Sequence, residues 1–147
     1  MLLSNDFAAK LCNEFDIRGL TDVSGFGLAG HLLEMLRASN AAAELNLSAI
    51  PVLDGVLELL AEGLESTLAP ANRDAEADID ASETILRSSR YATLFDPQTC
   101  GGLLMGIPAR HVETVLSRLS QQTGLNSAVI GRVVESAPSE ARLRLAD

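Results

Sequence analysis

Aromatic and basic residues are scarce in this sequence. Four Phe, one Tyr and no Trp make up 3% of its 147 residues. Single-stranded nucleic acid is commonly bound by stacking bases on aromatic side chains, so this scarcity argues against such a platform. Eleven Lys and Arg stand against 20 Asp and Glu, which leaves a net charge of −9. We expect no nucleic-acid partner and no anionic membrane partner, since their phosphates would be repelled.

Cysteines and long apolar runs are also few. Cys12 and Cys100 form no C-x-x-C pair and no Cys/His cluster, which argues against a disulfide scaffold and a zinc site. We expect both to be free thiols in a reducing compartment. No run is apolar over the length of a membrane span, and residues 1–7 (MLLSNDF) lack the features of a signal peptide. We therefore expect a cytoplasmic protein.

Apolar residues are abundant, at 47% of the chain, and their spacing predicts alternating helices and strands. Predicted helices cover residues 6–15, 26–39, 51–62, 80–89 and 108–123. Predicted strands cover residues 43–49, two runs within 91–108, 127–135 and 142–146. Residues 64–79 show no clean period and are predicted to form an exposed loop. We expect a single domain, residues 1–147, of the α+β class, with helices packed on a mixed β-sheet.

Residues 21–28 read TDVSGFGL and place one carboxylate just before a glycine-rich turn and a helix start. Backbone N–H groups in such turns favour anions, and Asp22 could hold the Mg²⁺ that neutralises a polyphosphate. Gly25 and Gly27 would let the main chain approach a ligand closely. The alternative, favoured on spacing alone, is an ordinary turn in which Ser24 or Asp22 caps the helix.

Residues 96–104, DPQTCGGLL, form a second glycine-rich stretch. Thr99, Gly101 and Gly102 could present donors to a phosphate or to another domain. The alternative is a Gly-Gly turn that joins two strands. For Cys100, a buried small hydrophobic residue is the preferred interpretation over a reactive thiol.

His31 lies one turn after Gly27 on a predicted helix. It could act as a base or contact a phosphate, but a lone helical His is more often packed or solvated. No Ser/His/Asp or Cys/His set can be assembled from neighbours in the sequence. The four acidic residues of the 64–79 segment are more typical of a solvated edge than of a metal site.

Together, the two glycine-rich blocks resemble the C-terminal domain of selenophosphate synthetase (selenide, water dikinase). The family pattern is T-D-[VI]-[TS]-G-F-G-L-x-G-H followed by F-D-P-Q-T-S-G-G-L-L, and the blocks begin here at Thr21 and Phe95. Segments 63–73 (GLESTLAPANR) and 128–135 (AVIGRVVE) also resemble the family. The resemblance implies the fold of the C-terminal domain of the aminoimidazole ribonucleotide synthetase superfamily.

This resemblance implies a parent enzyme that converts selenide, ATP and water to selenophosphate, AMP and phosphate, and that depends on Mg²⁺. The full enzyme is a homodimer of two-domain subunits, with ATP mainly on the N-terminal domain in a cleft closed by the C-terminal one. The Asp of the T-D block contributes to metal binding, which maps onto Asp22. The implied nucleotide-side positions are Gly25, Gly27, Thr99, Gly101 and Gly102.

Two departures from the family limit what this chain can do. The glycine-rich segment with the catalytic Cys or selenocysteine, and the N-terminal carboxylates that bind most of the metal, are not among these residues. We expect no catalytic residue here, no selenophosphate synthesis by this chain alone, and the N-terminal ATP-binding domain as partner. Cys100 stands where the family usually has Ser, so it is not the catalytic Cys. Two alternatives are a non-catalytic docking module, and the equivalent domain of another ATP-dependent superfamily member.

Overall fold

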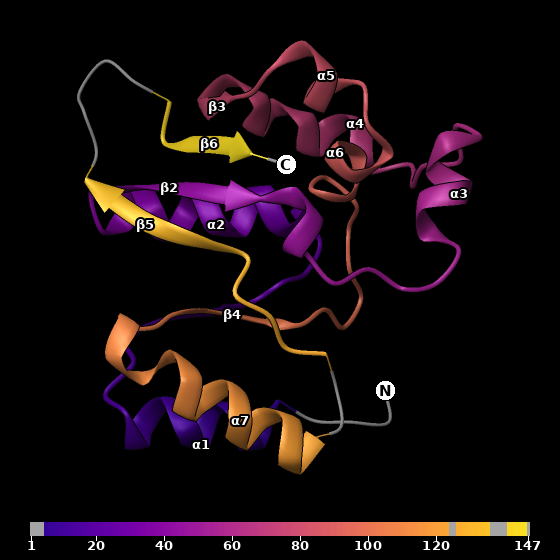
Figure 1. Ribbon diagram of the computed structural model, residues 1–147. Coiled ribbons are helices and arrows are strands. Elements are labelled where there is room, and N and C mark those ends of the chain that lie inside the picture. The colour runs from indigo at the N-terminus through magenta and orange to yellow at the C-terminus, as the bar shows by residue number, and fades with distance from the viewer. Residues whose placement is uncertain (1–4, 124–125, 136–140, 147) are drawn as a thin grey trace.

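The computed structural model describes residues 5–123, 126–135 and 141–146, and it combines helices with two β-sheets (Figure 1). The α-helices are α1 (Asp6–Glu14), α2 (Gly27–Ala38), α3 (Val56–Ala61), α4 (Ala69–Asn72), α5 (Glu83–Leu86), α6 (Ser89–Thr93) and α7 (Val112–Thr123). The 3₁₀ helices are η1 (Leu47–Ala49), η2 (Arg73–Asp78) and η3 (Ala109–His111). The strands are β1 (Gly19–Asp22), β2 (Ala41–Asn46), β3 (Ile79–Asp80), β4 (Leu103–Gly106), β5 (Gly131–Glu135) and β6 (Leu143–Ala146).

The strands form one two-stranded and one four-stranded sheet. In the smaller sheet, β1 pairs antiparallel with β4, and Asp22 lies opposite Leu103. In the larger sheet the order is β3-β6-β2-β5, with β6 parallel to both β3 and β2, and β5 antiparallel to β2. Helices packed on a mixed sheet confirm the predicted α+β class.

Two hydrophobic clusters lie on either side of the β1–β4 ribbon. The larger joins α2 to strands β2 and β6 and to α5 and α6, and the smaller joins α1 to α7. Side chains of β4 alternate between the clusters, since Leu103 and Met105 pack with the smaller and Leu104 with the larger. Period-two alternation in a strand explains this two-sided packing. The ribbon that ends at Asp22 is thus held from both faces.

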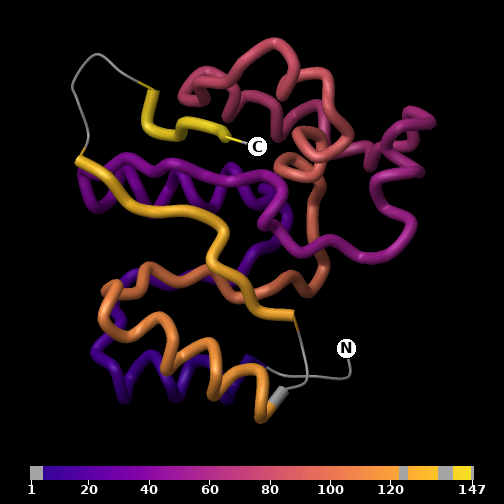
Figure 2. Tube along the Cα trace, in the orientation of Figure 1, coloured from indigo at the N-terminus to yellow at the C-terminus, as the bar shows by residue number. Residues whose placement is uncertain are grey.

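The chain changes layer at each of the two glycine-rich blocks. From β1 it passes through residues 23–26 into α2, and from α6 it returns through residues 94–102 into β4. A third passage lies after α7, where residues 126–130 lead into β5 (Figure 2). The first two passages contain the residues singled out from the sequence.

Several predicted elements are wrong. Residues 64–79 form α4 and η2 at 69–78 instead of an exposed loop, and part of the first apolar run within 91–108 belongs to α6 instead of a strand. The third helix begins at Val56, five residues after Pro51. The short helix that follows β3 is capped by Ser82, whose side chain accepts from the Ile85 N–H, and not by Asp80. Strand β1, which sequence reasoning missed, includes the first residues of the TDVSGFGL block.

The remaining long helices and strands agree with the periodic pattern. Helices α1, α2 and α7 lie within one or two residues of the predicted segments, apart from the short η3 turn that precedes α7. The strand predicted over 43–49 ends at Asn46, where the chain turns into η1, while β5 and β6 lie within their predicted runs. Among the described residues, no helix has both the length and the apolar character that crossing a membrane requires.

Candidate functional site

Backbone hydrogen bonds join the two glycine-rich blocks directly. Val23 N–H donates to the Gly102 carbonyl at 3.0 Å, and Gly101 N–H donates to the Val23 carbonyl at 3.2 Å. The Ser24 carbonyl accepts from Gln98 N–H at 3.0 Å. These bonds extend the β1–β4 ladder beyond the ends of both strands. Segments more than seventy residues apart in the sequence therefore form one structural unit.

The close approach of the blocks explains two of their glycines. A Cβ at Gly101 would lie 2.4 Å from the Val23 carbonyl oxygen. At Gly27, φ is +70°, and a Cβ would lie 2.7 Å from the Leu94 carbonyl oxygen. Steric crowding and backbone conformation do not explain the other two glycines, Gly25 and Gly102. A Cβ at either position would meet nothing within 4 Å. These two exposed positions leave the main chain open to a molecule outside the fold.

Asp22 lies exposed at the end of β1, beside this junction. Gly25, Thr99 and Gly102 are exposed as well, and Phe26 keeps 66% of its surface accessible. Among the described residues, the Asp22 carboxylate takes part in no hydrogen bond or ion pair. An open carboxylate beside exposed main chain can accept a cation or donors from an external ligand.

The helix-cap alternative is not what the structure shows. Phe26 occupies the N-cap position of α2, which receives no side-chain cap hydrogen bond. The Ser24 hydroxyl instead lies 3.0 Å from Nε2 of His31. Gly101 and Gly102 do not join two strands either, because α6 precedes them and β4 follows. Cys100 is an exposed free thiol, not a buried hydrophobic residue, whereas the free thiol of Cys12 is buried.

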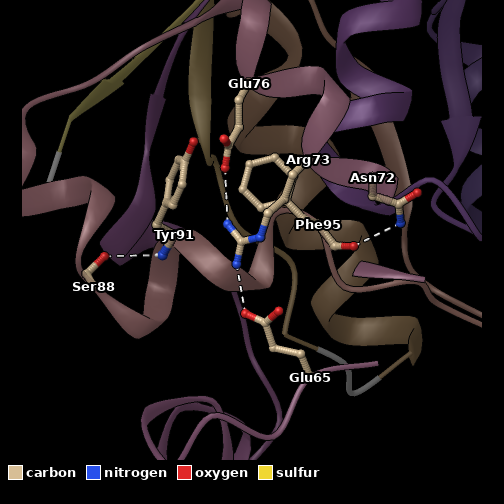
Figure 3. A network of polar contacts seen from close by, with 7 residues as sticks. All are labelled: Glu65, Asn72, Arg73, Glu76, Ser88, Tyr91 and Phe95. Atoms are coloured by element: carbon tan, nitrogen blue, oxygen red, sulfur yellow. Dashed lines mark hydrogen bonds and ion pairs between the residues drawn. The ribbon is translucent and has the colours of Figure 1, made fainter. Parts of the chain in front are cut away.

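Asn72 joins a third segment to both blocks. Its side-chain amide donates to the carbonyls of Gly25 and Phe95, at 2.9 Å each. Figure 3 shows the Phe95 contact. A single amide group holding two main-chain carbonyls fixes the spacing between the blocks, since both of its N–H donors are used. Asn72 lies in the segment that the sequence predicted to be a loop.

The neighbouring Arg73 makes three contacts that hold this segment against the core. Its guanidinium donates to Glu65 at 2.7 Å and to Glu76 at 3.1 Å, and it lies 5.0 Å from the centre of the Phe95 ring (Figure 3). Phe95 is fully buried. The cation–π contact connects this segment to the second glycine-rich block, and the two ion pairs hold the guanidinium in place from within the segment itself. Sequence periodicity gives no indication of these contacts, although segment 63–73 resembles the family.

Tyr91 packs in the same network. Burial, followed by the negative charge of Glu76 and a hydrogen bond to it, raises the pKa of Tyr91 to about 12. Its ring meets Phe95 edge-on, with centroids 5.0 Å apart. A hollow of about 250 Å³ lies beside it, between α3 and α6, lined in part by Leu60 and Arg73. The Arg73 network thus supports the core side of the junction, while Asp22 lies on its exposed side.

The described residues fit a shared magnesium site better than a complete one. They contain no group of three or more His, Cys, Asp or Glu side chains that could hold a metal ion. Mg²⁺ commonly binds one or two carboxylates and takes its remaining ligands from water and substrate phosphates. A single exposed carboxylate such as Asp22 meets that requirement only if other ligands come from outside this chain.

Comparison with known proteins gives a consistent family relationship. Residues 4–144 match the family model "AIR synthase related protein, C-terminal domain". Proteins named selenide, water dikinase are similar to most of the chain. The Geobacter metallireducens protein is 37% identical over 134 residues, which is 91% of this chain and 38% of that relative. The Haemophilus ducreyi protein is 35% identical over 130 residues, which is 88% of this chain and 36% of that relative. The Aeromonas hydrophila protein is 40% identical over 118 residues, which is 80% of this chain and 33% of that relative. The chain thus spans less than two fifths of the length of these curated relatives.

Proposed function

Since the chain belongs to the AIR synthase related protein family and corresponds to its C-terminal domain, we propose that it is the C-terminal part of a selenide, water dikinase. That enzyme makes selenophosphate from selenide, ATP and water. The observation that carries the proposal is the junction of the two glycine-rich blocks, which leaves Asp22 exposed beside open main chain. The partner is an N-terminal ATP-binding domain that completes the ATP cleft.

In this proposal, Asp22 contributes one oxygen ligand to Mg²⁺ on the ATP polyphosphate. The ion, when bound, neutralises phosphate charge that a domain of net charge −9 would otherwise repel. Gly25 and Gly102 let the phosphates approach the main chain, and Thr99 offers a hydroxyl on the same exposed side. Gly27 and Gly101 act indirectly, because their missing side chains allow the junction to close.

The domain organisation and assembly of the complete enzyme are part of the same proposal. Residues 1–147 act as one domain, selenide is handled by the partner domain, and this chain carries no catalytic residue of its own. The complete enzyme is a cytoplasmic homodimer. Because the chain spans only part of its relatives, it is expected to make no selenophosphate alone.

The test is Asp22→Asn in an enzyme that contains this chain together with an N-terminal ATP-binding domain. We expect Mg²⁺-dependent ATP turnover to fall by about tenfold or more, on the scale of the roughly 1.5–3 kcal/mol that a hydrogen bond to a charged group contributes. The urea midpoint should stay unchanged, because the Asp22 side chain has no partner within the described residues. Asp54→Asn, at another exposed carboxylate, is the matched control and should leave turnover unchanged. Full Mg²⁺-dependent turnover in Asp22→Asn would remove Asp22 from the mechanism.

A further inference from the structure

Ser24 is held at three points within the turn that joins β1 to α2. Its carbonyl accepts from Gly27 N–H and from Gln98 N–H, at 3.0 Å each. Its hydroxyl lies 3.0 Å from Nε2 of His31, one turn further along α2. The bond from Gln98 connects the two glycine-rich blocks, and the bond from Gly27 closes the turn within the first block. The hydroxyl contact connects the turn to the buried side of the helix.

His31 is the polar residue at the buried side of this contact. It keeps 8% of its surface exposed, and Phe26 covers it edge-on at 5.7 Å between ring centroids. Phe26 can lie this close to α2 because Gly30 has no side chain; a Cβ there would come within 2.8 Å of the Phe26 Cβ. The imidazole is therefore enclosed by the helix, by Phe26 and by the turn that ends in Ser24.

The other imidazole nitrogen has no hydrogen-bond partner within the described part of the chain. Nδ1 of His31 is buried, and the nearest acidic oxygen, Oε2 of Glu34, lies 3.9 Å away on a largely exposed side chain. An unpaired buried polar atom is unfavourable, so an apolar side chain would suit this pocket better unless Nε2 is needed. In the structure, the partner that requires Nε2 is the Ser24 hydroxyl.

We propose that His31 is a positioning residue that fixes Ser24, and with it the turn that presents Asp22. The importance of this role for turnover rests on the proposed function, while the hydrogen bond and its effect on the turn do not. His31 itself touches neither Asp22 nor any proposed ligand position. Its effect is to hold the loop between two ordered elements in one conformation, which lowers the cost of binding an ion there.

The first experiment uses NMR on this chain and does not depend on activity. In Ser24→Ala, the Nε2 ¹⁵N resonance of His31 should shift because its partner is lost, whereas the resonances of His111 should not. In His31→Leu, amide exchange at Gly27 and Gln98 should accelerate by about two- to tenfold, the range expected for one net hydrogen bond. Exchange in β2 should remain unchanged.

Conservative variants separate this role from simple packing. His31→Gln retains a polar group that can reach Ser24, and Ser24→Thr retains the hydroxyl, so both should keep exchange at Gly27 and Gln98 near the wild-type rate. His111→Leu is the matched control, since His111 packs against Phe15 far from this turn in the sequence. An unshifted Nε2 resonance in Ser24→Ala, or equal exchange in His31→Leu and the wild type, would overturn the proposal. If His31→Leu does not fold, Ser24→Ala decides, because Ser24 is only half-buried.

A second experiment tests positioning in the enzyme with its N-terminal domain. His31→Leu should raise the Mg²⁺ concentration for half-maximal turnover by about two- to tenfold, with a smaller loss at saturating Mg²⁺. Faster amide exchange without a change in Mg²⁺ requirement would contradict a positioning role. Asp22→Asn should leave the exchange rates at Gly27 and Gln98 unchanged, so a failure of the Asp22 assignment is seen separately from a failure of this one.

Discussion

Replacing Gly101 with alanine should open the junction between the two glycine-rich blocks. The new Cβ would lie 2.4 Å from the Val23 carbonyl oxygen, whereas real Cβ contacts essentially never come closer than 3.0 Å. The obstacle is backbone, which cannot swing aside as a flexible side chain does. Relief requires the second block to move away from Val23, and that movement weakens the two hydrogen bonds between Val23 and residues 101 and 102.

The expected loss in the free energy of unfolding follows from these contacts. Each hydrogen bond contributes a net of about 0.5–1.5 kcal/mol, and overpacking at a tight site costs about 1–3 kcal/mol. Because moving the block relieves part of the overpacking, we expect the free energy of unfolding to fall by about 2–4 kcal/mol. For a domain of this size, that loss lowers the melting temperature by roughly 5–15 °C. Urea unfolding followed by circular dichroism measures the same change as a lower midpoint.

Gly102→Ala is the matched control, one residue away in the same block. A Cβ there meets nothing within 4 Å, so the change should stay within about 0.5 kcal/mol of the wild type or be slightly stabilising. Equal midpoints for Gly101→Ala and Gly102→Ala would refute the reasoning, because the two substitutions differ in the contact with Val23. A similar loss in both would point to a general requirement for glycine in this loop, not to the contact with Val23.

Two further predictions concern Asn72 and Tyr91, which lie on the core side of the junction. Asn72→Ala should lower the free energy of unfolding by about 1–3 kcal/mol in urea, because it removes donors from the Gly25 and Phe95 carbonyls; an unchanged midpoint would contradict this. Tyr91, the sole tyrosine, should titrate at about pH 12 in an absorbance titration, and a midpoint near 10 in the folded protein would contradict its burial beside Glu76. Since its folded pKa lies above the unfolded value near 10, its stabilising contribution is complete below pH 10 and is lost as pH rises to about 12.

The sequence predicted those parts of the fold that have one apolar face. Helix α2 buries Leu32, Leu33 and Leu36 against the larger sheet, and a single apolar face of this kind gives a clear 3.6-residue period. Strand β6 alternates strictly, with Leu143 and Leu145 buried and their neighbours exposed. In these elements, local pattern and tertiary packing agree, so the pattern was sufficient.

Prediction failed where distant contacts decide the conformation. Residues 69–78 show no period, and their helical turns are held by Asn72 and Arg73, which contact Gly25, Phe95 and Glu65. The apolar run at 91–95 fits a strand or a buried helix equally well. Here the Ser88 side chain, which accepts from the Tyr91 N–H, begins α6 and settles the choice. That cap was visible in the sequence, but the contacts of Asn72 and Arg73 were not.

In the candidate site too, the residue types could be predicted from the sequence, whereas their contacts could not. Residue type and spacing pointed to Asp22 and the glycines, but they favoured an ordinary capped turn, and only the family resemblance paired the two blocks. The spacing could not show that Gly101 packs on Val23, or that the Ser24 hydroxyl faces His31 instead of the helix end. The first fact depends on the β1–β4 register, which joins residues more than eighty positions apart. The second depends on the path of the turn between β1 and α2, which the residue spacing does not determine.

The position of Asp22 explains how one carboxylate can matter in a domain with 20 acidic residues. Most of these side chains lie on exposed helices or loops or pair with a nearby Arg, as Glu65 and Glu76 do with Arg73. Asp22 instead ends a ribbon packed between two hydrophobic clusters, and the turn that follows it is tied to the second block by Val23 and Ser24. Its backbone is therefore fixed while its carboxylate is exposed and unpaired within the described residues. A carboxylate held in this way would lose little entropy on binding an ion, which is the property that the proposed Mg²⁺ site, shared with a second domain, requires.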